Sequence, residues 1–234
     1  MTLEICIDRI ESGLAAVAGG ANRLEVCSAL EIGGLTPSSG LLAECCELPD
    51  VSVMAMIRPR GGDFCYSNRE AEVMVRDIVA AREIGVDGIV IGALTSALAV
   101  DRGVCQRLLD AAGPVDVTFH RAFDLVADPF EALDELQGLG IRRLLTSGQR
   151  ATAIEGIDLI RQLVDRSGDL AVMAGAGVDS EIVPELLQVG VREIHSSASS
   201  EESVTPSAFA ADFGGRQRVT CREKVRKLRV ALDS

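Results

Sequence analysis

The sequence predicts a single-domain (β/α)8 barrel, the fold known as a TIM barrel, spanning residues 1–234. Two observations lead to this prediction. Short apolar strands alternate with amphipathic helical segments eight times along the chain, and a glycine turn recurs before every second strand. Eight alternations in a chain of this length favour a closed barrel over a doubly wound open sheet, which is the alternative architecture.

The expected strands are short and mostly apolar, and they lie at 3–7, 23–27, 51–57, 88–92, 115–119, 143–146, 170–174 and 193–196. Helices are expected at 12–19, 37–46, 69–84, 102–112, 129–139, 151–166 and 180–189. Ser12 is the expected N-cap of the first helix. A basic segment at 221–232 is expected to form a closing helix, and the Ser- and Ala-rich segment 199–215 is expected to be an irregular loop.

Four of the expected helices end in one pattern, a glycine followed by two residues and then a strand. The glycines are Gly20, Gly85, Gly140 and Gly190. A glycine at this point is the expected left-handed stop of a helix. All four precede even-numbered strands, a regularity that suits a closed, quasi-symmetric ring.

The same pattern sets the register of the even-numbered strands. The third, fifth and seventh residues from each glycine fall on one face of a strand, and this set includes Arg23, Glu25 and His195. The intervening residues are apolar. We expect the polar set to point into the barrel, with Glu25 and His195 in one layer, because the opposite register would bury these charges against the helices without partners.

A polar group follows the expected fifth strand in the stretch 117–124, which reads VTFHRAFD. His120, Arg121 and Asp124 occur there within five residues. Polar side chains at the carboxyl ends of barrel strands are where this fold places functional sites. The alternative is that His120 is a hydrogen-bonded core histidine and that Arg121 and Asp124 form a local surface pair.

Composition excludes several function classes. The net charge of −12 and the low aromatic content of 3% argue against partners such as nucleic acids and anionic membranes. The sequence shows neither a signal-peptide pattern nor a membrane-spanning apolar run. The seven cysteines lack zinc-type spacing and are expected to be reduced thiols in the cytoplasm.

Two of the cysteines are candidate metal ligands. Cys6 and Cys27 lie on neighbouring expected strands and are expected to face inward, near Met54 and Met56. Thiolate and thioether sulfurs favour Cu(I). Cysteine and methionine are also ordinary core residues, which is the alternative interpretation.

Several segments resemble the CutC family of copper homeostasis proteins over roughly residues 3–198. The two most specific are 57–66 (IRPRGGDFCY) and 117–124 (VTFHRAFD), and the others are 3–6, 23–27, 33–38, 145–148, 173–177 and 195–198. The resemblance implies a cytoplasmic barrel that self-associates as a dimer or tetramer and binds Cu(I), with Cys6 and Cys27 as the metal ligands. The segment 199–215 departs from the family's pattern.

Two functions are therefore expected as alternatives: a copper homeostasis protein that binds Cu(I), and an enzyme acting on a small anionic substrate, phosphorylated ones included, at the mouth of the barrel. Arginine forks and small-residue loops suit anions, although the arginines could instead pair with nearby acids. The candidate anion ligands are Arg58, Arg60, Arg121, Ser147, Gly175, Gly177 and Ser196, and the candidate acid–base residues are Glu25, His120, Asp124 and His195.

Overall fold

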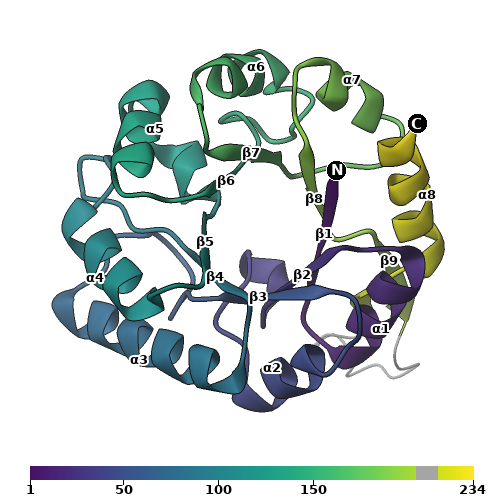
Figure 1. The fold of residues 1–234 in the computed structure, drawn as a ribbon, viewed down its shortest axis with the longest axis horizontal. Helices are drawn as coiled ribbons and strands as arrows, with labels where there is room; N and C mark the ends of the chain where they lie inside the picture. Colours follow the sequence, from purple (N-terminus) through teal and green to yellow (C-terminus); the bar gives the residue numbers. More distant parts are fainter. Residues whose placement is uncertain (204–215) are drawn as a thin grey trace.

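Eight parallel strands form a closed ring in sequence order, with the helices packed around its outside (Figure 1). The computed structural model describes residues 1–203 and 216–234. The last barrel strand pairs with the first, with Glu4 beside His195 in the register. This closure confirms the predicted barrel and excludes the doubly wound sheet.

The strands of the ring are β1 (Thr2–Ile7), β2 (Arg23–Val26), β3 (Ser52–Met56), β4 (Gly88–Ile91), β5 (Asp116–Phe119), β6 (Arg143–Thr146), β7 (Ala171–Ala174) and β8 (Glu193–Ser196). The helices are α1 (Ile10–Gly19), α2 (Ser39–Cys46), α3 (Asn68–Ile84), α4 (Arg102–Ala112), α5 (Pro129–Gly138), α6 (Ile157–Arg166), α7 (Val183–Gln188) and α8 (Arg222–Asp233), with 3-10 turns η1 (Leu30–Ile32) and η2 (Arg121–Leu125).

The predicted glycine stops are confirmed. Gly20, Gly85, Gly140 and Gly190 all have positive φ, at 97°, 104°, 75° and 92°. This left-handed conformation suits a residue without Cβ. The turns therefore deliver each following strand with the register that the sequence predicted.

Several helix starts differ from the prediction, and two of the differences have a clear structural cause. Ser12 is not an N-cap, because α1 begins at Ile10 and the buried Ser12 hydroxyl instead accepts the backbone N–H of Thr220. Helix α6 begins at Ile157 and not at 151. The chain before it passes so close to β6 that a Cβ on Gly156 would lie 2.0 Å from the Ser147 carbonyl oxygen.

The C-terminal part carries a hairpin before α8. β9 (Ser199–Ser203) pairs with β10 (Arg216–Thr220) in antiparallel fashion. The segment expected to be irregular, 199–215, therefore begins as a strand, and 204–215 lies outside the described residues. Helix α8 packs between α1 and α7 and completes the outer layer (Figure 1).

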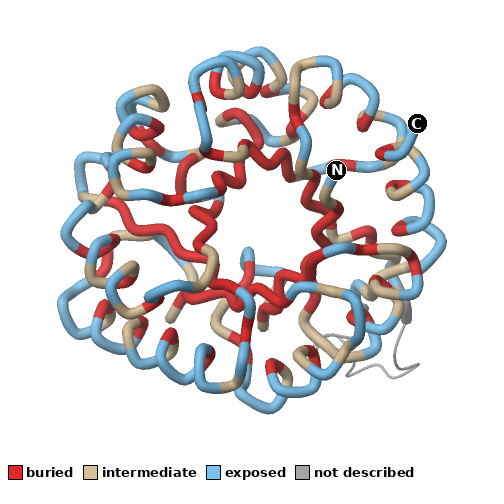
Figure 2. The backbone as a smooth tube through the Cα atoms, in the orientation of Figure 1, coloured by how far each residue is buried: buried red, intermediate tan, exposed pale blue. Residues whose placement is uncertain are grey.

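The hydrophobic core lies between the ring and the helices, where alternate strand residues such as Leu24, Ile89 and Ile194 are fully buried. Figure 2 shows the strand ring as an almost continuous buried band. Arg23, Glu25 and His195 are buried as well, on the other face of their strands. The predicted register is therefore confirmed.

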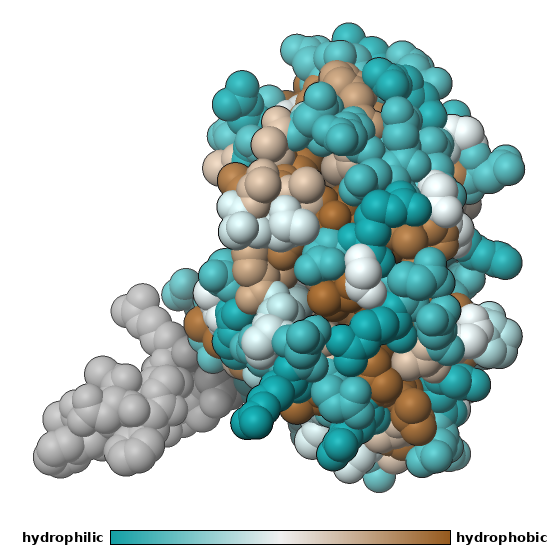
Figure 3. Space-filling model, turned by 90° about the vertical axis from the view of Figure 1, so that its left-hand side faces the viewer, coloured by the Kyte–Doolittle hydropathy of each residue, from teal (hydrophilic) through white to brown (hydrophobic). Residues whose placement is uncertain are grey.

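On the face shown in Figure 3, hydrophobic residues form small separate areas between hydrophilic ones. Within the described part of the chain, no helix has both the length and the apolar character needed to cross a bilayer.

Candidate functional site

A network of paired charges fills the part of the barrel interior near the amino ends of the strands. The Arg23 guanidinium donates to Glu4 Oε2 and to Glu193 Oε2, each at 2.5 Å. Arg143 Nε donates to the same Glu193 oxygen at 2.6 Å, and its Nη1 donates to Thr118 Oγ1 at 3.1 Å. Each buried charge thus has a partner of opposite sign, which the cost of desolvation requires.

This network of charges continues towards the carboxyl ends of the strands, where it reaches His195. Glu4 Oε1 lies 2.7 Å from His195 Nδ1. Burial opposes ionisation of Glu4, but Arg23 and the hydrogen-bonded His195 outweigh it and lower the pKa of this carboxyl to about 2. Glu4 is therefore a fixed anion that orients the imidazole and leaves Nε2 facing the next layer of the barrel.

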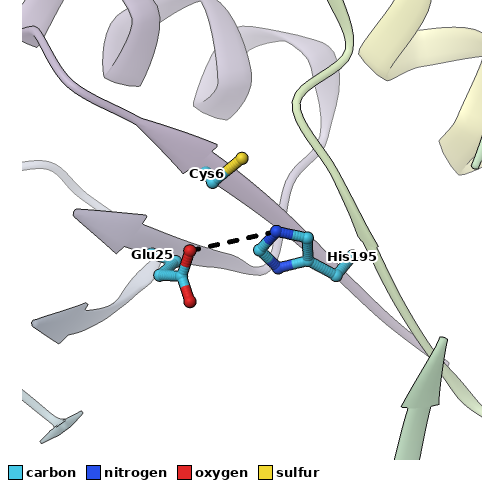
Figure 4. Close-up of side chains that lie close together, drawn as sticks. All are labelled: Cys6, Glu25 and His195. Atoms are coloured by element: carbon cyan, nitrogen blue, oxygen red, sulfur yellow. Dashed lines mark ion pairs between the residues drawn. The ribbon is translucent and has the colours of Figure 1, made fainter. Parts of the chain in front are cut away.

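Three potential metal-ligating side chains meet in that layer (Figure 4). Cys6 comes from β1, Glu25 from β2 and His195 from β8, and one ligand atom from each lies within 4.8 Å of the others. His195 Nε2 is 3.9 Å from Glu25 Oε2. Glu25 and His195 thus share a layer as the register predicted, and Cys6 joins them from the neighbouring strand.

The protonation of this group is set by burial and by its own members. Burial opposes the charged form of His195, but Cys6, Glu25 and the hydrogen bond to Glu4 outweigh it, so the pKa of His195 is raised well above its usual value. Burial and the nearby Glu4 raise the pKa of Glu25. Glu25 Oε1 is buried without a hydrogen-bond partner among the described residues.

Cys27, the second predicted metal ligand, lies outside the group formed by Cys6, Glu25 and His195. Its thiol donates to Glu25 Oε2 at 3.5 Å, and it packs in a small buried cluster with Met54, Met56 and Val90. Burial and the Glu25 carboxylate raise the pKa of this thiol well above its usual value. Cys27 is thus a protonated core thiol that reaches the site through Glu25.

A cavity of about 820 Å³ opens above this layer at the carboxyl ends of the strands. The predicted site residues that line it are Cys6, Glu25, Arg58, His120, Arg121, Asp124, Gly177, His195 and Ser196. The structure therefore brings most of the predicted residues together at one mouth. It does not bring Cys27, Arg60, Ser147 or Gly175 to the cavity lining.

His120 is held as a neutral donor. Its Nδ1 accepts the backbone N–H of Ala122 at 3.1 Å, which leaves the ring proton on Nε2. Burial and the Arg58 charge lower the pKa of His120 to about 3. Nε2 is buried and has no partner among the residues that the structure describes.

Arg58 and Arg60 hydrogen-bond to the loops around them. Arg58 donates through Nη1 and Nη2 to the carbonyl oxygens of Ile32, Gly34 and Gly62, while its Nε is buried without a partner among the described residues. Arg60 lies outside the cavity and is paired with Glu70 at 2.5 Å and with Asp63. The alternative of pairing with a nearby acid therefore describes Arg60, while Arg58 pairs with neither Asp63 nor Glu25.

Asp124 joins η2 to the loop after β6. It accepts hydrogen bonds from Thr146 Oγ1, from the backbone N–H and hydroxyl of Ser147, and from the Gln149 N–H. Arg121 donates to Asp124 and to Ser147 Oγ. These contacts occupy both carboxylate oxygens, so the predicted Arg121–Asp124 pair is a structural clamp beside the cavity.

The predicted small-residue loops shape the cavity wall. Gly177 (φ 67°) lines it, and Ser196 Oγ donates to the Val178 carbonyl. Gly175 lies behind the wall, where an added Cβ would be 2.6 Å from Leu145 and 3.3 Å from His195. Its lack of a side chain keeps the His195 ring in place.

Sequence reasoning missed two contributions. Glu4 shares the parity of Cys6 along β1, which indicates the same inner face, but its position beside His195 follows only from the pairing of β1 with β8. Lys224 and Lys227 of α8 also line the cavity, and no strand-based pattern indicates that.

Comparison with known proteins identifies the family. The CutC family model matches residues 1–200. The chain belongs to the CutC family. It is 44% identical over 237 residues to the mouse protein named copper homeostasis protein cutC homolog, covering 97% of this chain and 87% of that one. It is 46% identical over 200 residues to the human protein of the same name, covering 85% and 73%.

A solved CutC structure has the same architecture. The crystal structure of a CutC protein from Streptococcus agalactiae superposes with a TM-score of 0.81 at 33% identity, covering 84% of this chain and 98% of that one. Thiamine phosphate pyrophosphorylase from Pyrococcus furiosus, at 16% identity and a TM-score of 0.64 over 99% of this chain and 95% of that one, shares the fold alone.

Proposed function

We propose that this CutC protein binds Cu(I) at the barrel mouth, with Cys6 Sγ and His195 Nε2 as the principal ligands. The observation that carries the proposal is the buried convergence of Cys6, Glu25 and His195 ligand atoms within 4.8 Å. A thiolate and an imidazole are ligands that Cu(I) accepts. The naming of mouse and human relatives as copper homeostasis proteins supports the choice of copper.

The surroundings of His195 suit a ligand role. Metal-binding histidines commonly direct their other ring nitrogen to a carboxylate, which fixes the tautomer, and Glu4 stands in that position at 2.7 Å from Nδ1. Because the pKa of His195 is raised, metal binding at Nε2 must release a proton. Copper affinity should therefore rise with pH.

Cys27 enters the proposal as a secondary ligand. Its thiol donates to Glu25 Oε2 and lies one layer from the Cys6 group, so Cu(I) would need to displace both that contact and a proton. We infer that Cys6 contributes more than Cys27. All seven cysteines are free thiols, which suits the reducing compartment that Cu(I) binding requires, and we propose a cytoplasmic location on that ground.

The test is an anaerobic competition titration with bicinchoninate as the Cu(I) probe. Cys6→Ser is expected to weaken Cu(I) binding by at least about tenfold, and Cys27→Ser by less. Cys46→Ser is the matched control, since Cys46 is a half-buried thiol at the end of α2, away from the cavity. Unchanged affinity in the Cys6→Ser, Cys27→Ser double variant would contradict the proposal.

Zn(II) provides a second arm of the same experiment, because cysteine, histidine and carboxylate ligands also suit zinc. Cu(I) is expected to outcompete Zn(II) for the Cys6 site. Tighter Zn(II) binding would refute the assignment to copper.

A further inference from the structure

The cavity wall across the ring from Cys6 carries a donor that copper binding does not use. His120 follows β5, which stands opposite β1 in the barrel (Figure 1). Its side chain is nearly buried, with 4% of the residue exposed, yet it lines the cavity. Its Nε2–H has no partner among the described residues. A buried donor without an acceptor is costly in a folded protein and calls for a ligand or solvent partner.

The His120 ring is fixed in position on several sides. Nδ1 accepts the Ala122 N–H, and the Phe64 ring lies 4.9 Å away between centroids. On the β4 side, Gly92 leaves room for the ring, since a Cβ there would be 2.2 Å from Cε1 of His120. The Nε2–H is therefore a preorganised donor, and its direction costs nothing to fix when a ligand arrives.

The charge around this donor favours an anion. The Arg58 guanidinium stacks over Phe64 at 4.9 Å and places a buried positive charge beside His120. Arg121, the next residue in the chain, lines the cavity too but is paired with Asp124. Further cations among the described residues line the cavity on the opposite side, where α8 packs beside β1: Arg218, Lys224 and Lys227. The cavity therefore has positive charge beside His120 and across from it, although the chain carries a net charge of −12.

Acidic residues share the lining: Glu25, Asp124, Asp179 and the exposed Glu181. Asp124 accepts hydrogen bonds from η2 and the loop after β6, and Asp179 accepts the backbone N–H groups of Glu181 and Ile182. Glu25 faces the Cys6 side and keeps one oxygen without a partner among the described residues. That oxygen can accept a hydroxyl from the same ligand.

Apolar side chains complete this wall. They are Leu30, Ile32, Met56, Phe64 and Leu145. A cavity of about 820 Å³ with such a lining suits a carbon skeleton better than a bare inorganic ion.

We propose that the cavity binds a small organic anion, one oxygen of which accepts the Nε2–H hydrogen bond of His120 while its charge faces Arg58. The interacting group is an oxyanion, either a carboxylate or a phosphate. His120 acts here as a fixed hydrogen-bond donor and not as a general acid, because the imidazole is neutral. The oxyanion contacts at His120 and Arg58 lie in the same cavity as the proposed copper ligands Cys6 and His195 but do not involve them, so the two proposals are tested separately.

The test is nitrogen-detected NMR of the histidine side chains. The chain has only two histidines, so the signals of His120 and His195 can be assigned from single variants. Pyruvate and inorganic phosphate are titrated separately as the carboxylate and phosphate probes. The expected result is a shift of the His120 Nε2–H signal by one or both probes, and the probe that binds more tightly identifies the oxyanion class.

His120→Asn is the decisive variant. The Asn side-chain oxygen can still accept the Ala122 N–H, but the donor at the Nε2 position is lost. Affinity for the effective probe is expected to fall at least about tenfold, as for loss of a hydrogen bond to a charged group. Cys46→Ser, away from the cavity, serves as the matched control and should leave this affinity unchanged.

A second variant tests the same hydrogen bond if His120→Asn fails to fold. Gly92→Ala pushes on Cε1 of His120 and should weaken probe binding while the cysteine sites keep their Cu(I) affinity. The proposal is overturned if neither probe moves the Nε2–H signal up to about 10 mM, where a ligand of millimolar Kd would occupy most sites. Unchanged binding in His120→Asn overturns it as well.

Discussion

His120 lines the cavity with a buried imidazole. Its Nδ1 accepts the backbone N–H of Ala122 in η2, and its Nε2 is buried without a partner among the described residues. The ring is neutral because burial and Arg58 lower its pKa to about 3.

This depressed pKa predicts a pH dependence of stability. In the unfolded chain His120 has its ordinary pKa of 6.5 and is protonated below that pH, whereas in the folded chain it is protonated only near pH 3. Folding stability contributed by this residue is therefore complete above pH 6.5 and is lost as the pH falls towards 3, by up to about 1.4 kcal/mol per pH unit. The measurement is the free energy of unfolding in urea across this range, for the native chain and for His120→Asn.

The variant supplies the reference because asparagine does not titrate. The native chain should lose stability faster than His120→Asn between pH 6.5 and 3. Parallel curves for the two proteins would mean that His120 has the same pKa in the folded and in the unfolded chain.

At the level of elements, the Asp124 clamp holds two loops together at the mouth. Without the carboxylate, the backbone N–H groups of Ser147 and Gln149 lose their acceptor, and Arg121 loses its partner. Asp124→Ala is therefore expected to lower the free energy of unfolding by about 3 kcal/mol. Equilibrium unfolding in urea measures this, and Asp128→Ala, which removes an exposed helix cap of α5, should cost only about 1 kcal/mol.

A loss in Asp124→Ala no larger than that of the cap variant would show that solvent replaces the clamp.

The segment from β6 to α6, which contains the partners of Asp124, could be predicted from the sequence only in part. The strand β6 was predicted with its bounds, because its alternation and its glycine stop are local signals. The start of α6 was not, because it depends on the close approach of Gly156 to Ser147, a tertiary contact without a local pattern.

The candidate site, too, could be predicted from the sequence only in part. The parity rule placed Glu25 and His195 in one layer, since side-chain direction along a strand follows from counting residues. The pairing of Cys6 with His195 required the closure of β1 on β8. Cys27 lies outside the group because Cys6 is in register with Glu25, which leaves Cys27 two residues further along the chain. Neither register can be predicted from one strand alone.

For the whole molecule, the buried network of charges makes the barrel interior depend on complete pairing. Replacing Arg23 leaves Glu4 and Glu193 buried with fewer partners. Arg23→Met is expected to destabilise the fold by about 3–5 kcal/mol in urea unfolding, the cost of breaking one partner of a buried ion pair.

Arg226→Met is the matched control for that variant. Arg226 pairs with Glu223 on the exposed face of α8, and loss of such a surface pair should change stability by less than about 1 kcal/mol. Equal effects of the two variants would mean that water reaches the barrel interior. The self-association expected for the family stays a prediction, to be measured by analytical ultracentrifugation.

The position of Cys6, Glu25 and His195 on the first, second and last strands has one further consequence. These strands form the seam at which the two ends of the ring meet. A ligand held by all three side chains would link these three strands and would bind only to the closed ring. By mass action it would therefore stabilise the closed barrel relative to any state in which β1 and β8 have separated. Occupancy of the site would then report barrel closure, and hydrogen exchange at β1 and β8 should slow first when the site is filled.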